Sequence, residues 1–223
     1  MSPGFDEEQI HKMRTTVKKM RALSEWTGTQ HTNFFRKYYK AAGRIRDVQL
    51  LLIKIRKGEC IVPPAFSDWL EGYLHQMKIK WQKIFNEGDS NKQFKELKKS
   101  LKGKHQKKNT LKFAADKNDK IILLRNERPL SDEQIHTGRK TIKEIDFLNK
   151  WENKKTDEGM KKVSDETGNF MDTCSAIKLL RLYIEQETDD AKRKDAEILQ
   201  TQWENQKEEE KIKLLNSIDS LPH

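Results

Sequence analysis

The chain contains two copies of one segment, DEEQIHKMRTTVKKMRALSEW at residues 6–26 and SDEQIHTGRKTIKEIDFLNKW at residues 131–151. They align without gaps at an offset of 125 residues, the separation of His11 from His136. The identical pairs are Glu8/Glu133, Gln9/Gln134, Ile10/Ile135, His11/His136, Arg14/Arg139, Thr16/Thr141, Lys18/Lys143, Leu23/Leu148 and Trp26/Trp151. Unrelated helices of ordinary composition rarely match so closely, so the segments indicate an internal repeat.

The repeat extends beyond these segments, because the same offset places Gly43 on Gly168 and Asp47 on Asp172. A repeated unit of that length covers half of a 223-residue chain. We therefore expect a single domain over residues 1–223, made of two related halves of about residues 1–125 and 126–223.

Composition favours a basic, helical protein. Lys and Arg total 45 against 35 Asp and Glu, which gives a net charge of +10. Such an excess favours polyanion partners, for example nucleic acid, polyphosphate or an anionic membrane surface. Only 34% of the residues are hydrophobic, which suffices for amphipathic helices because each needs one apolar stripe.

Neither cysteine nor hydropathy points to an extracellular or membrane protein. Cys60 and Cys174 lie in no zinc-ligand spacing, and structural disulfides are not expected. The first residues lack the basic-then-apolar pattern of a signal peptide, and no apolar run approaches the ~20 residues of a membrane span. We expect a cytoplasmic protein without a membrane segment.

Gly and Pro, at 10 and 5 residues, are rare and mark helix ends. Asp6 with Gln9, and Ser131 with Gln134, predict capped helix starts, while Gly58 predicts a helix end. The expected helices cover residues 6–26, 30–57, 66–86, 91–102, 131–151, 172–187 and 189–217.

Other segments carry weaker patterns, and none is a persistent strand pattern, so the fold class is all-α. Residues 104–128 are expected to form a connection with one helix, and the lysines from Lys92 to Lys120 a solvated face. The stretch bracketed by Gly159 and Gly168 is expected to be less regular.

The first segment carries a cationic stripe. At ~100° per residue, His11, Arg14, Lys18 and Arg21 fall within a sector of roughly 80°. Apolar residues fill the adjoining sector: Ile10, Met13, Val17 and Met20. The stripe therefore borders the apolar face and is expected to look into a crevice.

The second copy retains most of this stripe. His136, Arg139 and Lys143 lie on the same arc, Asp146 replaces the fourth cation, and Lys140 lies beside the arc.

The helix expected at residues 30–57 adds further cations: Arg36, Lys37, Lys40, Arg44 and Arg46. Asp47 follows them, and we interpret it as a carboxylate that orients the cations. For Gly43 we favour close packing of a neighbouring helix over contact with a ligand. Trp26 and Trp151 end the matched helices and are interpreted as core residues rather than base-stacking platforms.

Three other interpretations remain open. Rows of charge on long helices are usually solvated faces. His11 and His136 could be core histidines that donate to backbone carbonyls. An E-x-x-H spacing with Glu8 and Glu133 would suit a metal, although the surrounding cations repel divalent ions, so no metal site or catalytic group is assigned. No nucleotide-binding or nucleophile motif is present, and no cofactor is expected.

The motif His11-x-x-Arg14-x-x-x-Lys18-x-x-Arg21, followed by Gly43-Arg-Ile-Arg46-Asp47 and repeated from His136, resembles the CHAD family (conserved histidine α-helical domain). The resemblance covers residues 11 to about 182. It implies a compact helical bundle of two pseudo-symmetric four-helix halves around a basic central cavity or pore. It also implies non-catalytic binding of inorganic polyphosphate.

Carried over by resemblance, the polyphosphate-binding residues are His11, Arg14, Lys18, Arg21, Lys40, Arg44, Arg46, His136, Arg139, Lys140 and Lys143. Asn169 and Met171 stand where the first copy has Arg44 and Arg46, which predicts binding weighted toward the N-terminal half. The resemblance further implies that any triphosphate-metabolising partner is a separate polypeptide, and that polyphosphate granules are one place of action.

Two rival functions remain at this point. A nucleic-acid-binding helical protein would share the charge and the salt dependence, but it should also expose aromatic residues or a groove-shaped helix. An enzyme acting on polyphosphate or nucleoside triphosphates ranks third.

Overall fold

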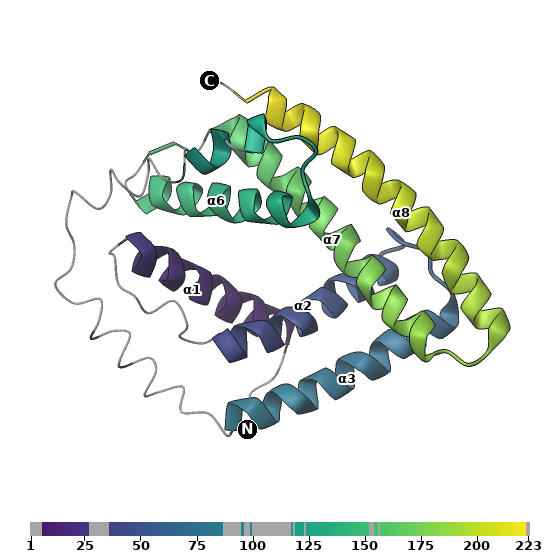
Figure 1. Ribbon diagram of the computed structural model, residues 1–223. Helices are drawn as coiled ribbons and strands as arrows, with labels where there is room; N and C mark the ends of the chain where they lie inside the picture. Colours follow the sequence, from purple (N-terminus) through teal and green to yellow (C-terminus); the bar gives the residue numbers. More distant parts are fainter. Residues whose placement is uncertain are drawn as a thin grey trace. The chain divides into compact units, whose positions relative to one another are not determined.

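Helices make up most of the part of the chain that the computed structural model describes (Figure 1). That part comprises residues 6–26, 36–86, 95, 99, 117, 119–122, 124–151, 154, 155 and 157–221. The helices are α1 (Glu7–Trp26), α2 (Arg36–Arg56), α3 (Pro64–Asn86), α6 (Asp132–Trp151), α7 (Glu158–Gln186) and α8 (Asp190–Asp219). No strand occurs among these residues, so the all-α prediction is confirmed for them.

Helix boundaries follow the sequence repeat. Adding 125 to the bounds of α1, 7 and 26, gives 132 and 151, which are the bounds of α6. The same shift moves α2 to residues 161–181, inside α7, and α3 to residues 189–211, within one residue of the start of α8. The helices therefore recur in the same order, although α7 and α8, with 29 and 30 residues, are longer than α2 and α3, with 21 and 23.

The predicted caps are present. Gln9 donates its backbone N–H to Asp6 Oδ1 at 2.7 Å. Ser131 and Gln134 form the reciprocal capping box, with bonds of 2.8 and 3.2 Å. Gly58 follows α2 with φ of 72°, a conformation that glycine adopts without steric cost.

The prediction for the segment before residue 172 is wrong. Residues 158–186 form one continuous helix, α7, which passes through Gly159 and Gly168. Asp157 caps it by accepting the backbone N–H of Met160 at 2.8 Å. Burial of Val163 and Phe170 outweighs the helix-weakening effect of glycine, about 1 kcal/mol per residue.

Two smaller differences concern the other helices. α3 begins at Pro64 rather than residue 66, because proline suits the first turn of a helix. The helix predicted at residues 91–102 and most of the segment 104–128 lie outside the described residues.

The chain forms two compact units, each assembled from separated segments. Unit 1 contains the described residues of Met1–Val17, Phe35–Gln93 and Asp172–Glu208, and unit 2 contains those of Lys18–Phe34, Phe94–Met171 and Glu209–His223. Each unit draws on residues from both sides of position 125. The halves 1–125 and 126–223 thus describe the repeat in the sequence, not the compact units.

Unit 1 holds a large apolar core. α2 packs against α3, as Figure 1 shows, and α7 and α8 supply further buried residues. Phe66 lies at its centre, with ring centroids 5.3 Å from Tyr183 and 6.2 Å from Trp203. The buried face of α1 contributes Ile10, as its apolar pattern predicts.

In unit 2, Trp26 packs on Leu148 and Leu23, which confirms the core role predicted for Trp26. The side chain of Trp151 lies outside the described residues. Beside this contact lies a buried cation, since the side chain of Lys117 is 4% exposed and its Nζ lies 2.6 Å from both Glu25 Oε1 and Glu144 Oε2.

Lys117 corrects the prediction that the lysines from Lys92 to Lys120 form a solvated face. Burial lowers the pKa of Lys117, but hydrogen bonds and Coulomb attraction from Glu144 and Glu25 outweigh it, and the pKa lies above its ordinary value. Burial raises the pKa of Glu144, although Lys117 opposes that shift.

We expect Lys117→Met to lower the free energy of unfolding by about 3 kcal/mol at neutral pH, because two carboxylates lose their shared cation. Lys150→Met is the control, since Lys150 pairs with Asp146 at 2.8 Å on the surface and should contribute about 0.5 kcal/mol or less. The raised pKa of Lys117 favours folding below its ordinary value of 10.5, an advantage lost as pH rises through the folded pKa. Urea unfolding measures both variants, and equal losses would contradict a structural role for Lys117.

Candidate anion-binding site

In unit 1, the predicted site residue Arg14 holds α1 against α2. Its Nη1 donates to the backbone carbonyl of Tyr39 at 3.0 Å, and its guanidinium carbon lies 4.4 Å from the centroid of the Tyr39 ring. A methyl carbon on residue 43 would lie 2.6 Å from Arg14 Nη1. Gly43 therefore makes room for an arginine of the neighbouring helix, in line with the packing role predicted for it.

The other cations of unit 1 are more exposed. His11 is exposed, and its Nε2 lies 3.5 Å from Thr15 Oγ1, so it is not a core histidine. Lys40 and Arg44 are exposed one turn apart on α2. Arg46 Nη1 lies 2.6 Å from Glu7 Oε1, so a carboxylate of α1 holds this arginine.

In unit 2, cations gather around the half-buried ring of His136. Burial lowers its pKa below the ordinary value of 6.5, and the positive charge of Lys140 lowers it further. Glu133 opposes the shift, while Arg139 and Lys18 add to it. Lys18 of α1 therefore lies close enough to lower the pKa of the same histidine as Lys140 and Arg139 of α6. One anion could then contact residues of both helices.

Two nitrogen atoms of this group are buried without a hydrogen-bond partner among the described residues, His136 Nδ1 and Arg139 Nε. His136 therefore makes no hydrogen bond through Nδ1 to a backbone carbonyl of the described residues. Arg139 Nη2 lies 3.4 Å from the methyl position of Gly168, which repeats the Arg14 and Gly43 contact at the 125-residue offset.

Three further predicted residues belong to unit 2. Lys143 is exposed, and its Nζ lies 3.9 Å from Asp165 Oδ1. Arg21 is half-buried and Lys18 is exposed on α1. In unit 2 the structure thus brings Arg139, Lys140 and Lys18 near His136. The other predicted residues His11, Arg14, Lys40, Arg44 and Arg46 belong to unit 1.

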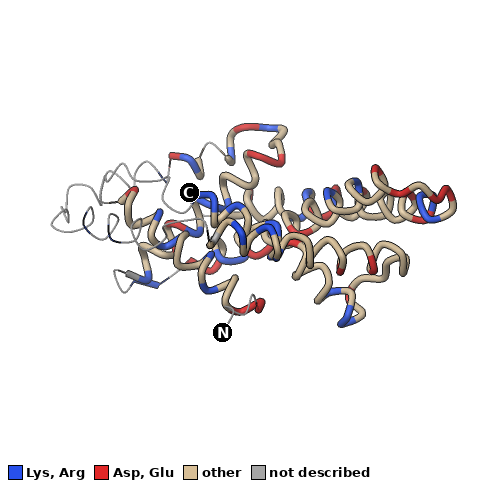
Figure 2. Tube along the Cα trace, turned by 90° about the horizontal axis from the view of Figure 1, so that it is seen from below, with Lys and Arg blue, Asp and Glu red and all other residues tan. Residues whose placement is uncertain are grey.

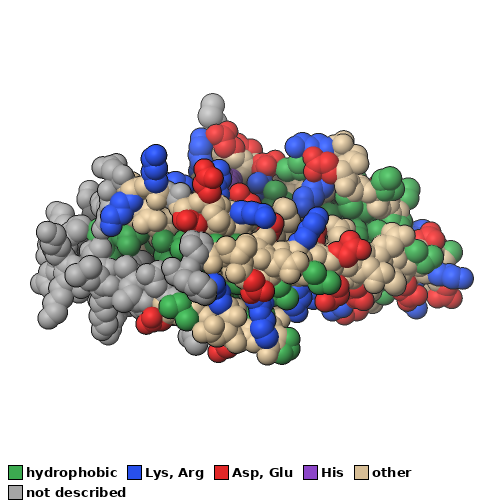
Figure 3. Space-filling view, turned by 90° about the horizontal axis from the view of Figure 1, so that it is seen from above, with side chains coloured by type: hydrophobic (Ala, Val, Ile, Leu, Met, Phe, Trp, Pro, Cys, Tyr) green, Lys and Arg blue, Asp and Glu red, His purple; other side chains and the backbone are tan. Residues whose placement is uncertain are grey.

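Charges of both signs are mixed elsewhere. Figure 2 shows acidic and basic positions on the same helices, and the face in Figure 3 shows Lys and Arg among Asp and Glu. The net charge of +10 is therefore not collected into one patch on that face.

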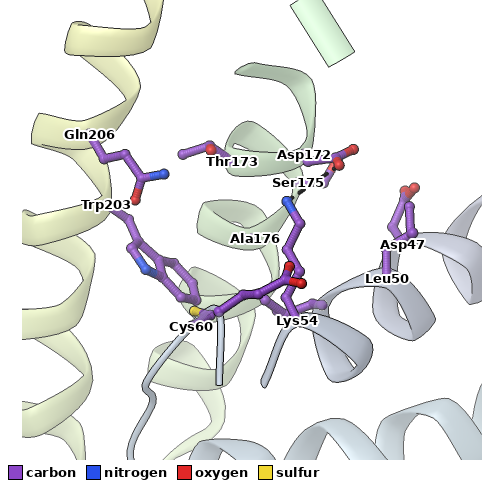
Figure 4. A pocket seen from close by; sticks show the side chains of 12 residues that line it. Asp47, Leu50, Lys54, Cys60, Asp172, Thr173, Ser175, Ala176, Trp203 and Gln206 are labelled. Atoms are coloured by element: carbon purple, nitrogen blue, oxygen red, sulfur yellow. Dashed lines mark hydrogen bonds and ion pairs between the residues drawn. The ribbon is translucent and has the colours of Figure 1, made fainter. Parts of the chain in front are cut away.

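A cavity among the described residues lies in unit 1 and is not basic. It has a volume of about 190 Å³ and is lined by Asp47, Glu59 and Asp172 against the one cation Lys54, with apolar and neutral residues between them (Figure 4). This cavity does not fit the basic central cavity that the resemblance implies.

Metal and membrane sites find no support in the described part of the chain. It contains no group of three or more His, Cys, Asp and Glu side chains arranged to hold a metal ion. None of its helices is both long and apolar enough to cross a membrane.

Comparison with protein-family models, curated proteins and solved structures found no match to this chain. The resemblance to the CHAD family therefore rests on the motifs alone.

The contact of Arg14 with Gly43 predicts that alanine substitutions at three helical glycines will differ in their effect on stability. Gly72 on α3 has no atom within 4 Å of its methyl position, Gly168 has Arg139 at 3.4 Å, and Gly43 has Arg14 at 2.6 Å. Alanine at Gly72 or Gly168 should stabilise the protein by about 1 kcal/mol, because alanine favours a helix. Alanine at Gly43 should lose this gain, since Arg14 must leave its position on Tyr39.

Urea unfolding of the three variants tests this order, and Gly43→Ala in an Arg14→Ala background provides the matched control. There the substitution should become stabilising by about 1 kcal/mol. If Gly43→Ala stabilises the protein equally in both backgrounds, the position of the Arg14 guanidinium does not depend on the absence of a side chain at residue 43.

Proposed function

We propose that the chain is a non-catalytic module that binds inorganic polyphosphate. The observation that carries the proposal is the group of cations around His136 in unit 2. Burial lowers the pKa of the half-buried His136, and Lys140, Arg139 and Lys18 lower it further, while His136 Nδ1 and Arg139 Nε lack hydrogen-bond partners among the described residues. This arrangement costs stability in the free protein and becomes favourable when an anion is bound.

A linear polyphosphate suits these residues. It carries about one charge per phosphate, and lysine and arginine form strong charge-assisted hydrogen bonds with phosphate oxygens. Unit 1 carries further predicted phosphate-binding residues, of which His11, Lys40 and Arg44 are exposed, while Arg14 and Arg46 contact Tyr39 and Glu7. The two pseudo-symmetric halves of the CHAD resemblance belong to the same proposal, supported by the repeat of helix boundaries.

The aromatic residues on α3 do not favour the nucleic-acid alternative, because they are not fully exposed for stacking on bases. Trp69 and Tyr73 stack on each other with ring centroids 4.8 Å apart, and both are half-buried. Asp68 and Glu71, exposed on the same helix, would repel a phosphate backbone there. Polyphosphate granules, and a separate enzyme that metabolises polyphosphate, are the partners that this function implies.

The first experiment is a calorimetric titration with long-chain polyphosphate. Lys18→Gln/Lys140→Gln removes two exposed cations near His136 without touching the buried contacts of Arg14 or Arg139. We expect roughly tenfold weaker binding, and a plot of log K against log salt that is shallower by roughly one to two, because each lost phosphate contact retains a counterion.

Lys80→Gln/Lys178→Gln is the matched control, because it removes the same net charge from exposed positions of unit 1 outside the site. Equal loss in both double variants would show that net charge alone drives binding. Competition by RNA, phosphate for phosphate, would instead support the nucleic-acid alternative.

The depressed pKa of His136 predicts the pH dependence. A bound polyanion favours the imidazolium, so binding should raise this pKa and take up a proton. Affinity should therefore increase as pH falls from about 8 to 5, and His136→Gln should make this increase smaller. Calorimetry in two buffers of different ionisation enthalpy measures the proton uptake, and an unchanged pH profile in His136→Gln would exclude His136 as a contributor.

A further inference from the structure

One of the cations predicted to bind phosphate, Arg46 of unit 1, is engaged by a carboxylate. Its Nη1 donates to Oε1 of Glu7 on α1, and the two atoms lie 2.6 Å apart. The side chain of Arg46 is 16% exposed, whereas that of Glu7 is 48% exposed. The guanidinium is therefore confined by its surroundings, while the carboxylate lies at the surface and can leave the pair by rotating into solvent.

This ion pair lies on the same seam between α1 and α2 as the contact of Arg14 with Tyr39. Glu7 and Arg14 are seven residues apart on α1. Tyr39 and Arg46 are likewise seven residues apart on α2, so both contacts join the same two helix faces. His11 shares this face of α1, four residues after Glu7 and three before Arg14. Glu7 thus brings a carboxylate to a row of predicted phosphate-binding cations.

The second copy of the repeat has no such pair. Glu7 and Arg46 correspond there to Asp132 and Met171. The acid is retained without the arginine, and Asp132 Oδ1 lies instead 3.9 Å from Lys211 Nζ. Helix α6 nevertheless has 20 residues, as α1 has. The repeated helices therefore form without an arginine at this position, which favours a role for Arg46 in binding.

Glu7 resembles the proposed ligand in its chemistry. Carboxylate and phosphate oxygens form the same kind of charge-assisted hydrogen bond with a guanidinium. Glu7 Oε1 therefore occupies a place on Arg46 that a phosphate oxygen would take, and its negative charge repels a second anion there. Because one partner of the pair is so exposed, the pair is weak, and a ligand that carries many phosphates can displace it.

From these observations we propose that Glu7 is an internal competitor for Arg46 and thereby sets the affinity of the protein for polyphosphate. In the free protein the Glu7 carboxylate holds Arg46. When the polymer binds, one of its phosphates displaces this carboxylate, and its other phosphates contact further cations, which offsets the lost ion pair. This role of Glu7 rests on the proposed binding of polyphosphate.

Calorimetric titration with long-chain polyphosphate tests this role by comparing the unaltered protein with Glu7→Gln and Glu8→Gln. Both glutamates lie in the first turn of α1, so either variant removes one negative charge from the same helix end. Glu8 pairs with Lys12 at 2.6 Å, which makes Glu8→Gln the matched control. We expect Glu7→Gln to bind roughly fivefold more tightly than Glu8→Gln, since it releases Arg46 from its competitor.

Salt dependence distinguishes competition from a general change of charge. In the unaltered protein, binding at Arg46 displaces Glu7, whereas in Glu7→Gln it displaces a salt counterion from Arg46. The plot of log K against log salt should therefore become steeper by up to about one in Glu7→Gln and stay unchanged in Glu8→Gln.

The same comparison in an Arg46→Gln background completes the test. There Glu7→Gln should no longer tighten binding, because the cation for which it competes is absent. Equal affinities of Glu7→Gln and Glu8→Gln, or a tightening by Glu7→Gln that persists without Arg46, would overturn the competitor role of Glu7. Absence of binding in every variant, with circular dichroism showing each to be folded, would overturn the proposed function and this role with it.

Discussion

The contact of Arg14 with the backbone of α2 at Gly43 is the constraint on which the rest of the arrangement depends. A guanidinium can lie across that helix only because residue 43 has no side chain, and there it donates to Tyr39 and covers its ring. A half-buried arginine of this kind is costly unless its hydrogen bonds are made. The repeat retains the same pair as Arg139 and Gly168, so the duplicated cation serves packing as well as charge.

Local charge, rather than net charge, distinguishes the surroundings of His136 from the cavity of unit 1. In unit 2 burial lowers the pKa of His136 and nearby cations lower it further, whereas carboxylates and Lys54 both line a cavity in unit 1. Both lie in a chain whose charges are otherwise mixed along the helices. A formal charge of +10 would have suggested anion binding everywhere, and the cavity contradicts that simple expectation.

Local sequence signals predicted the helices well, because caps and glycines act within one turn of the chain. Asp6, Ser131 and Gly58 mark boundaries that the structure reproduces. The signal failed at Gly159 and Gly168, where burial of neighbouring residues of α7 overrides the weak helix propensity of glycine.

The site was less predictable, because its contacts join distant segments. The cationic character of His136, Arg139 and Lys140 could be read from their spacing, but the approach of Lys18 could not. Glu7 as the partner of Arg46, Tyr39 as the partner of Arg14 and the burial of Lys117 depend on tertiary packing. One of these contacts could have been predicted. Both copies of the repeat keep an arginine, Arg14 or Arg139, together with a glycine, Gly43 or Gly168, and in the structure each arginine contacts the glycine of its own copy.

The central claim is that an anion binds beside His136, and the titration of that ring tests it most directly. Two-dimensional NMR of the histidine ring protons, with His136→Gln to assign the signal, gives its pKa in the free protein and with long-chain polyphosphate. The account predicts a pKa below 6.5 in the free protein that rises when polyphosphate binds. A titration curve that polyphosphate leaves unchanged, while binding is seen by calorimetry, would place the ligand elsewhere and contradict the account.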